Sequence, residues 1–351
     1  MVIYRVPAGL SVNSPRRSFC PKCKTEIPWY RNIPVGTWIL QRGKCAACGE
    51  PIAVRYLLVE LLTACLFVAA WLVAIYTLPE PRLTPAILMM VMVVLLVAIS
   101  CIDAEHMLIP VVFCWWGMAI AVIGNSLDPL LVTLVSVVGE VPWWKGGVLA
   151  LIGLAAGWGI LALVVILGKL LLGQRKEEFE EPTDWSLREA ESDEEELSFV
   201  VGEERIGWSE LFYRKNDRIV IEGRGILVDG EPTEATEITI YRESILVDDE
   251  RKSIESLKSL SGKAQKVIIP REAMGAGDPP LLGMIGAFIG WEGVLFTLFS
   301  SCLYALFMAA LGRIGFGRPQ PFGPFLALGG LTWVFGGWKI WIWYFEKIGG
   351  F

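Results

Sequence analysis

The sequence predicts a polytopic α-helical membrane protein with about seven spans, a cysteine-bearing domain before the first span and a β-rich domain inserted between two later spans. Composition is the first reason: 54% of the 351 residues are hydrophobic and only 19% are charged, whereas soluble domains carry about a quarter charged residues. The second reason is that apolar residues gather in blocks of roughly 18 residues or more, long enough to cross ~30 Å of hydrocarbon as helices. These blocks are Tyr56–Pro79, Leu83–Ile102, Met107–Leu127, Gly146–Gly168, Gly293–Gly312 and Pro319–Trp338.

A shorter apolar stretch, Pro279–Trp291, completes the seven expected spans. Residues 1–55 carry nine Lys and Arg against two acids, and basic residues flanking a span favour the cytoplasmic side. We therefore expect 1–55 to be cytoplasmic, which puts Asp103 and Asp278 at span ends on that same membrane face. Topology explains this basic segment better than nucleic-acid binding does, so nucleic acid is not an expected partner. No apolar signal segment is visible near the start.

Residues 174–270 are expected to form a soluble domain on the cytoplasmic side. The stretch Arg175–Glu196 is rich in acids and too polar to build a core, so we interpret it as an acidic linker. Beyond it, segments such as RIVIEG, GILVDG and EITIY alternate apolar and polar residues between Asp-Gly and Glu-Gly turn signals, which is typical of a small β-sheet domain. No nucleophile, phosphate loop or metal-ligand cluster is visible in this sequence, so an accessory or recognition role is expected.

Two CxxC pairs form the strongest local motif. Cys20 and Cys23 make one pair, and Cys45 and Cys48 make the other. Pairs at this spacing are typical of sites in which four thiolates bind one Zn²⁺ ion tetrahedrally. Two disulfides or a redox pair are the alternatives, but a reducing cytosol disfavours them. Because protein would fill all four coordination positions, the zinc is expected to be structural.

Asp103 and Asp278 are the candidate catalytic residues, because charges at the edge of a membrane helix are costly and mark functional sites. Asp103 ends an apolar run in CIDAEHMLIP, and Asp278 follows GAG, whose glycines allow close approaches that a side chain would block. Two carboxylates at one site cannot both ionise readily, so one can accept a proton from water while the other polarises a peptide carbonyl. The alternative is that each caps a helix or extends to the interface. His106, the single histidine, has no nucleophile motif beside it and is expected at the interface.

Several segments together resemble bacterial type IV prepilin peptidases. PRRSFCPKC, RNIPVGTWILQRGKCAACGEPIAVRY and LVELLT are similar to the N-terminal region of that family. CIDAEHMLIP resembles its first aspartate motif, REAMGAGDPPLLGMIGAFIGW its second, the GxGD motif, and GPFLALGG its last span. The resemblance covers about three-quarters of the chain, everything except 174–270, with the motifs in the family's order.

The resemblance implies a membrane aspartic endopeptidase of the bacterial inner (cytoplasmic) membrane that removes the basic leader of prepilins or pseudopilins at the cytoplasmic face. It also implies that the cysteine-bearing domain assists N-methylation of the new N-terminus from S-adenosylmethionine. By matching position, Asp103 and Asp278 are the expected catalytic dyad and the four cysteines the expected zinc ligands. Two alternatives remain: a non-catalytic member acting in pilus or secretion assembly, and another GxGD intramembrane protease.

The chain departs from the family pattern at three places. Family members usually have a further span before VIYR, and commonly a lysine where this chain has Pro280. The insert lies where the family normally has a short loop. The expected domains are 1–55 (zinc-binding), 56–173 (four spans with the first Asp), 174–270 (linker and β-rich insert) and 271–351 (GxGD motif and last spans).

Overall fold

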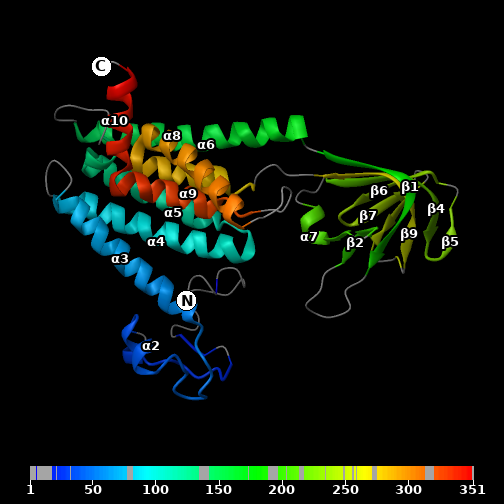
Figure 1. Ribbon diagram of the computed structural model, residues 1–351, viewed down its shortest axis with the longest axis horizontal. Helices are drawn as coiled ribbons and strands as arrows, with labels where there is room; N and C mark the ends of the chain where they lie inside the picture. Colours follow the sequence, from blue (N-terminus) through cyan, green and yellow to red (C-terminus); the bar gives the residue numbers. More distant parts are fainter. Residues whose placement is uncertain are drawn as a thin grey trace. The chain divides into compact units, whose positions relative to one another are not determined.

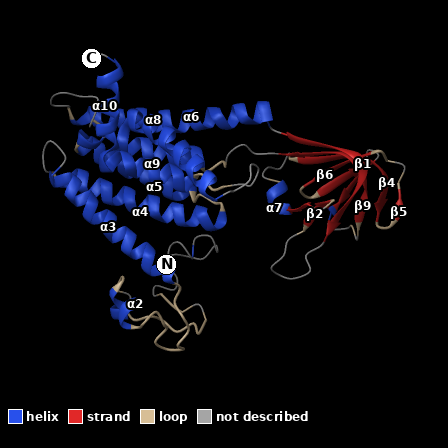
Figure 2. Cartoon of the chain, viewed as in Figure 1, coloured by secondary structure: helices blue, strands red, loops and turns tan. Residues whose placement is uncertain are grey.

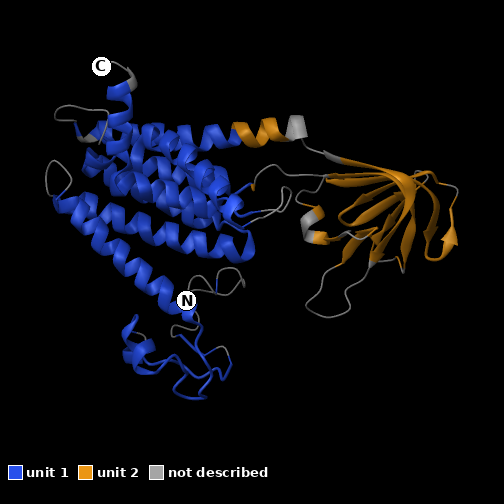
Figure 3. Ribbon diagram, viewed as in Figure 1, with its two compact units in different colours: residues 1–162, 276–351 blue, residues 163–275 orange. Residues whose placement is uncertain are grey.

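The computed structural model divides into two compact units, residues 1–162 with 276–351 and residues 163–275 (Figure 3). The first unit holds the cysteine-bearing segment and most of the apolar helices, and the second holds the β-rich insert (Figure 2). The structure describes residues 5, 18–20, 22–31, 33–76, 82–133, 142–172, 174–188, 197–202, 204–212, 217–233, 235–247, 250–254, 257, 259–270, 275–312 and 320–349.

Among the described residues, five helices are long and apolar enough to cross a membrane, so the chain is a polytopic membrane protein as predicted. Four of them lie in α3 (Val54–Tyr76), α4 (Leu83–His106), α6 (Trp143–Leu172) and α8 (Asp278–Gly312). The fifth is the continuous run of α9 (Gly323–Thr332), η4 (Trp333–Gly337) and α10 (Trp338–Gly349) (Figure 1). α5 (Val111–Leu127) is also apolar but shorter, and the 3-10 turn η2 (Pro129–Leu131) follows it. The number of spans stays a prediction.

Gly290 divides α8 into two helical segments. Its φ of 79° and ψ of 177° are non-helical and are essentially restricted to glycine. Val294 Cγ2 lies 2.7 Å from the position that a Cβ on Gly286 would occupy, although eight residues of straight helix rise about 12 Å. The chain therefore turns sharply at Gly290, near the end of the stretch 279–291 and just before the stretch 293–312, which the sequence predicts as separate spans.

Glycines let α6 and α8 approach at backbone distance. A Cβ on Gly153 would overlap the carbonyl oxygen of Gly286, and a Cβ on Gly286 would overlap that of Gly153. Gly157 meets the Leu282 carbonyl in the same way. Within lipid, helices associate largely through such close packing of small residues. This contact holds the first segment of α8, which begins at Asp278, against α6.

The insert is a nine-stranded sheet of antiparallel pairs with the order β3-β2-β1-β9-β4-β6-β7-β8, and β5 pairs with β4 outside this path. A buried apolar cluster that includes Trp185, Phe199 and Ile221 forms its core, so the expected β-rich domain is present. The strands are β1 (Gln174–Arg188), β2 (Ser198–Val201), β3 (Glu204–Gly207), β4 (Arg218–Val228), β5 (Glu231–Pro232), β6 (Glu237–Tyr241), β7 (Ser244–Val247), β8 (Glu250–Ser253) and β9 (Leu260–Pro270), with the short helix α7 (Trp208–Leu211) after β3.

The interpretation of Arg175–Glu196 as a linker is wrong for its first part, because these residues up to Arg188 form most of the long strand β1. Its acids are offset by bases on the neighbouring strand: Lys266 Nζ of β9 lies 3.9 Å from Glu178 Oε1. Trp185, which also belongs to β1, is 2% exposed and anchors this strand in the core. The composition of β1 alone hides this, because its partner strand comes much later in the chain. The remainder of the expected linker, 189–196, lies outside the described residues.

The sheet contains an internal repeat of 46 residues that the sequence analysis missed. Hairpins β2–β3 and β7–β8 pair in the same register, starting from Ser198 and Ser244. In the first hairpin Arg205 Nε donates to Ser198 Oγ at 3.0 Å, and in the second Arg251 Nε donates to Ser244 Oγ at 2.9 Å. The strand order is also symmetric, because β3-β2-β1-β9 corresponds to β8-β7-β6-β4 read from the opposite edge. The sequence signal is the pair SFVVGEER and SILVDDER.

The α6–α8 contact leads to a stability prediction. Gly153→Ala should destabilise the protein by about 1–3 kcal/mol, because the new methyl group overlaps the α8 backbone. The matched control is Gly159→Ala in the same helix, where a Cβ meets nothing within 4 Å; alanine's higher helix propensity should leave it neutral or slightly stabilised. Thermal unfolding of the purified variants in detergent measures both. Equal midpoints for the two variants would contradict the contact.

Candidate functional site

Asp103 lies in the last turn of α4 and is 5% exposed. Met107 follows the helix in the left-handed conformation with φ of 49°, and its N–H donates to the Asp103 carbonyl oxygen at 2.8 Å. This is a common way for a helix to end. The Asp103 side chain is therefore held beside the end of an apolar helix, as the CIDAEHMLIP pattern indicates.

Asp278 is the first residue of α8 and is 4% exposed. The helix dipole favours a carboxylate at this end. Gly277, directly before it, packs against the loop that follows α4, because a Cβ on Gly277 would lie 2.6 Å from Ile109 Cβ. The second glycine of GAGD thus allows the close approach expected of it.

Gly323, at the start of α9, links the two helix ends. Its N–H donates to Asp103 Oδ2 at 3.0 Å, and a Cβ there would lie 2.5 Å from the same oxygen. Ile109 Cδ1 would be 3.3 Å from that Cβ, so Ile109 packs near both Gly323 and Gly277. The ends of α4, α8 and α9 therefore converge, and both buried aspartates belong to these ends. Neither Gly323 nor Ile109 stands out in the sequence as a site residue; the Gly-Pro helix start in GPFLALGG is the one signal that the sequence offers.

The end of α4 also carries charged groups that do not join the aspartates. Glu105 forms an ion pair with Arg55 at the start of α3, directly after the cysteine-bearing segment. His106 Nε2 lies 3.9 Å from Glu105 Oε2, and the side chain of His106 is 47% exposed. This exposed position fits an interfacial residue rather than a catalytic base.

The four predicted cysteine ligands converge in space. Their sulfur atoms all lie within 4.8 Å of one another, and Cys20 Sγ is 3.9 Å from Cys48 Sγ. A tetrahedral shell with Zn–S bonds of about 2.3 Å separates its sulfurs by about 3.8 Å. The donor set and its spacing therefore fit one tetrahedral metal ion with a preference for thiolates.

The two CxxC loops have the same backbone conformation. Lys24 N–H donates to the Cys20 carbonyl at 2.9 Å, and Gly49 N–H donates to the Cys45 carbonyl at 2.9 Å. Both donors adopt positive φ, 56° for Lys24 and 74° for Gly49. A lysine in this conformation is strained relative to glycine. Because the same geometry occurs in both loops, even at the cost of strain at Lys24, the two loops are better explained as halves of one metal-binding site than as unrelated turns.

Hydrogen bonding prepares part of this cluster for metal binding. Cys23 Sγ lies 3.3 Å from Thr25 Oγ1, and hydrogen bonds with the Thr25 side chain and backbone lower the pKa of Cys23 to about 6. Because thiolate is the metal-binding form, a lower pKa reduces the competition from protons. Lys22 and Glu50, one from each CxxC loop, form an ion pair at 2.6 Å that joins the loops at the surface.

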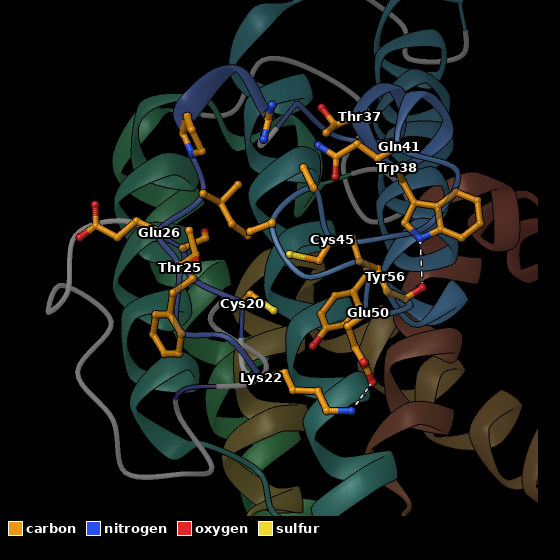
Figure 4. A pocket seen from close by; sticks show the side chains of 18 of the residues that line it. Cys20, Lys22, Thr25, Glu26, Thr37, Trp38, Gln41, Cys45, Glu50 and Tyr56 are labelled. Atoms are coloured by element: carbon orange, nitrogen blue, oxygen red, sulfur yellow. Dashed lines mark hydrogen bonds and ion pairs between the residues drawn. The ribbon is translucent and has the colours of Figure 1, made fainter.

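A cavity of about 440 Å³ adjoins the cysteines (Figure 4). Its walls come from both CxxC loops, from α2 (Gly36–Leu40) and from the first two turns of α3. Tyr56 and Glu60, one turn apart on α3, lie on the same helix face and both line it.

These features define a polytopic membrane protein with two buried aspartates at converging helix ends and a cluster of four cysteines that could hold a metal ion. Two family models match the chain: residues 1–74 match the bacterial peptidase A24 N-terminal domain, and residues 256–310 match the type IV leader peptidase family. The two matches cover the CxxC pairs and the GxGD motif, so the resemblance stated from these motifs is confirmed.

Relatives named prepilin leader peptidase/N-methyltransferase match as well. The protein of Aeromonas hydrophila is 27% identical over 93% of this chain and 74% of its own length. That of Myxococcus xanthus is 43% identical over 34% of this chain and 33% of its own length, and that of Bacillus subtilis is 34% identical over 46% and 56%. The chain thus spans about a third of the Myxococcus relative and about half of the Bacillus one. No solved structure matches the chain significantly.

The cysteine geometry predicts one bound metal ion per chain. Purified protein should contain about one equivalent, and Cys48→Ser should lose most of it, because three thiolates leave the tetrahedral shell incomplete. Elemental analysis after dialysis against a mild chelator measures this. Cys302→Ser, at an exposed cysteine outside the cluster, should retain the metal. Wild-type protein without metal but with two disulfides in this segment would contradict the prediction.

Proposed function

We propose that this chain is an aspartic endopeptidase that removes the leader of type IV prepilins or pseudopilins, with Asp103 and Asp278 as the catalytic dyad. The observation that carries the proposal is that the end of α4 and the starts of α8 and α9 meet around Ile109, and that a buried carboxylate lies at each of the first two. The names of the relatives, which combine prepilin leader peptidase with N-methyltransferase, support the substrate class and a second, N-methyltransferase reaction. The resemblance of the motifs implies that this reaction methylates the new N-terminus from S-adenosylmethionine.

The two carboxylates divide the chemistry of peptide hydrolysis. They share one proton, because two like charges at one buried site repel each other. The protonated carboxyl first donates a hydrogen bond to the carbonyl oxygen of the substrate. The ionised carboxylate then accepts a proton from water as the water oxygen bonds to the carbonyl carbon. As the C–N bond breaks, this carboxyl passes a proton to the leaving amine, which becomes the new N-terminus of the mature chain.

Backbone packing supports these roles by fixing the carboxylates. Gly323 N–H orients Asp103 Oδ2, and the contact of Gly277 with Ile109 holds the residue before Asp278. Pro279 and Pro280 lie in the first turn of α8, where proline's missing N–H breaks no intrahelical hydrogen bond. Pro280, in place of the lysine usual in the family, is therefore compatible with an intact helix start at Asp278, which favours a catalytic protein over a degenerate one.

We assign Zn²⁺ to the four cysteines, with a structural role. When bound, it supplies a cross-link between the two CxxC loops, and no coordination position remains open for catalysis. The identity of the metal is testable in the elemental analysis above.

We place the protein in the bacterial inner membrane with its aspartates at the cytoplasmic face. The excess of basic residues over 1–55 supports this orientation. The same face is where a basic prepilin leader, itself retained by the positive-inside rule, would be presented. The apolar helices are then surrounded by lipid. Nucleic acid is not proposed as a partner.

The dyad assignment predicts the effect of conservative substitutions. Asp103→Asn and Asp278→Asn should each lower leader cleavage at least about 100-fold, because an amide cannot exchange a proton with water or substrate. The double variant should be little worse than either single one, since the pair acts as a unit. Cleavage of a purified prepilin, followed by mass spectrometry, measures this. Asp184→Asn, at an exposed site on β1, is the control and should cleave normally. Substantial cleavage by correctly inserted Asp278→Asn would refute the assignment.

Gly323 provides a second, independent test. Gly323→Ala should lower cleavage about tenfold or more, because its Cβ would occupy the space of Asp103 Oδ2 and displace a carboxylate by a fraction of an ångström. The lowered kcat should come with near-normal KM, since substrate contacts are unchanged. Gly159→Ala serves again as the control. Wild-type kcat in Gly323→Ala would mean that this hydrogen bond does not position Asp103.

A further inference from the structure

α10 begins where the last apolar block of the sequence ends. That block, Pro319–Trp338, contains no charged residue, whereas α10 carries Lys339, Glu346 and Lys347. α9 and η4, which precede α10, have 10 and five residues and together rise about 20 Å. α10 has 12 residues, too few to cross ~30 Å of hydrocarbon on their own. The direction of α10 therefore decides whether it lengthens the last span or leaves it.

A sharp turn separates α10 from α9. Gly336 has φ of 129° and ψ of 0°, a backbone conformation that is open to glycine and rare for other residues. Gly337 lies against α8, because a Cβ on it would be 2.7 Å from Phe296 Cζ. Figure 1 shows α9 running along the neighbouring apolar helices and α10 directed across their ends. α10 therefore does not continue the direction of α9.

One face of α10 packs against the apolar helices. The ring of Trp341 lies 6.0 Å from that of Trp333 in η4. Trp333 is buried, and its ring lies 5.3 Å from that of Phe296 on α8. α9 begins at Gly323, which donates to Asp103, and α10 follows the other end of this helix. These aromatic contacts therefore hold α10 at the end of the helices opposite the aspartates.

The rest of the α10 surface is divided between apolar and charged side chains. Ile340 and Tyr344, one turn apart, share a face and are 57% and 48% exposed. Lys339 and Glu346, two turns apart, share a different face and are also exposed. Trp343, another exposed side chain, lies between these two faces. As a result, α10 is more strongly amphipathic than the long apolar helices α3, α4, α6 and α8.

The boundary between hydrocarbon and headgroups matches this surface. Tryptophan and tyrosine concentrate at that boundary, and lysine side chains there extend their charge to water while their stems stay in apolar surroundings. Lys339 Nζ lies 5.3 Å from the centre of the Trp338 ring, so charge and aromatic ring are held together. The exposed apolar surface continues onto α8, because Phe299 is exposed one turn beyond Phe296, the residue that Gly337 contacts.

We propose that α10 lies along the bilayer interface on the side opposite the aspartates, with Ile340 and Tyr344 among the acyl chains and Lys339 and Glu346 in the headgroup layer. The partner of this surface is lipid rather than a second protein chain. An interfacial helix buries its apolar face about 5–10 Å into the boundary. This depth agrees with a turn that comes about 20 Å along the run of α9 and η4, before ~30 Å of hydrocarbon is crossed. The inference does not depend on the proposed peptidase activity.

Photo-crosslinking identifies what contacts each face of α10. The photoreactive residue p-benzoylphenylalanine replaces Ile340, Tyr344, Lys339 or Glu346, one at a time, in the full-length protein. Each variant that keeps the wild-type unfolding midpoint is reconstituted in vesicles of phosphatidylethanolamine and phosphatidylglycerol and irradiated. Mass spectrometry then measures lipid adducts and cross-linked protein. The first two positions should give at least about fivefold more lipid adduct than the last two, because only the apolar face reaches the acyl chains.

A position on a spanning helix calibrates the yields. Val68 is exposed on α3 and should form lipid adducts as readily as Ile340 and Tyr344. Equal lipid yields at all four positions of α10 would show that α10 crosses the membrane. Cross-linked dimers from Ile340 or Tyr344 would show that a second copy covers this face, and no lipid adduct at any of the four would place α10 in water. Each of these three results would overturn the proposal.

Discussion

In lipid, apolar side chains gain little by leaving one helix surface for another, so close backbone contact is the constraint on which the membrane unit depends. Gly153 and Gly286 bring α6 and α8 together, and Gly277 and Gly323 bring the ends of α8, α4 and α9 around Ile109. The same lack of a side chain that permits these contacts also exposes the Gly323 N–H to Asp103. One buried carboxylate is thereby held at the end of α4 and another at the start of α8, positions where an unpaired charge is costly.

The cysteine-bearing segment is stabilised in a different way. Its described residues form few regular elements, η1 (Trp29–Arg31) and α2, and a segment this small cannot bury enough apolar area to hold its loops together. Convergence of four sulfurs supplies the missing constraint once a metal is bound. The loops so fixed form the cavity wall, and the ion pair between Arg55 and Glu105 joins this region to the helix that carries Asp103.

The insert is organised by symmetry. Two copies of a hairpin, each with an arginine donating to a serine across the strands, flank the central pair β4 and β9. One half of the sheet consists of β1, β2, β3 and β4, and the other of β6, β7, β8 and β9. The last strand of each half pairs with the first strand of the other, because β9 lies beside β1 and β4 beside β6. Neither half has a complete set of neighbours on its own, so the halves should fold cooperatively.

The sequence by itself determined the membrane class, the four cysteines, the two aspartates and the β character of the insert, because each is written in local pattern: long apolar blocks, CxxC spacing, charges at block ends and alternation. Tertiary structure decided the rest. The roles of Gly323 and Ile109, and the hydrogen bond from the Val35 N–H to Glu60, depend on partners distant in the chain. The acidic strand β1 looked like a linker for the same reason, since its stabilising lysines lie on β9. The composition of a segment indicates how much apolar surface it can bury, whereas the residues that contact it are determined by the tertiary structure.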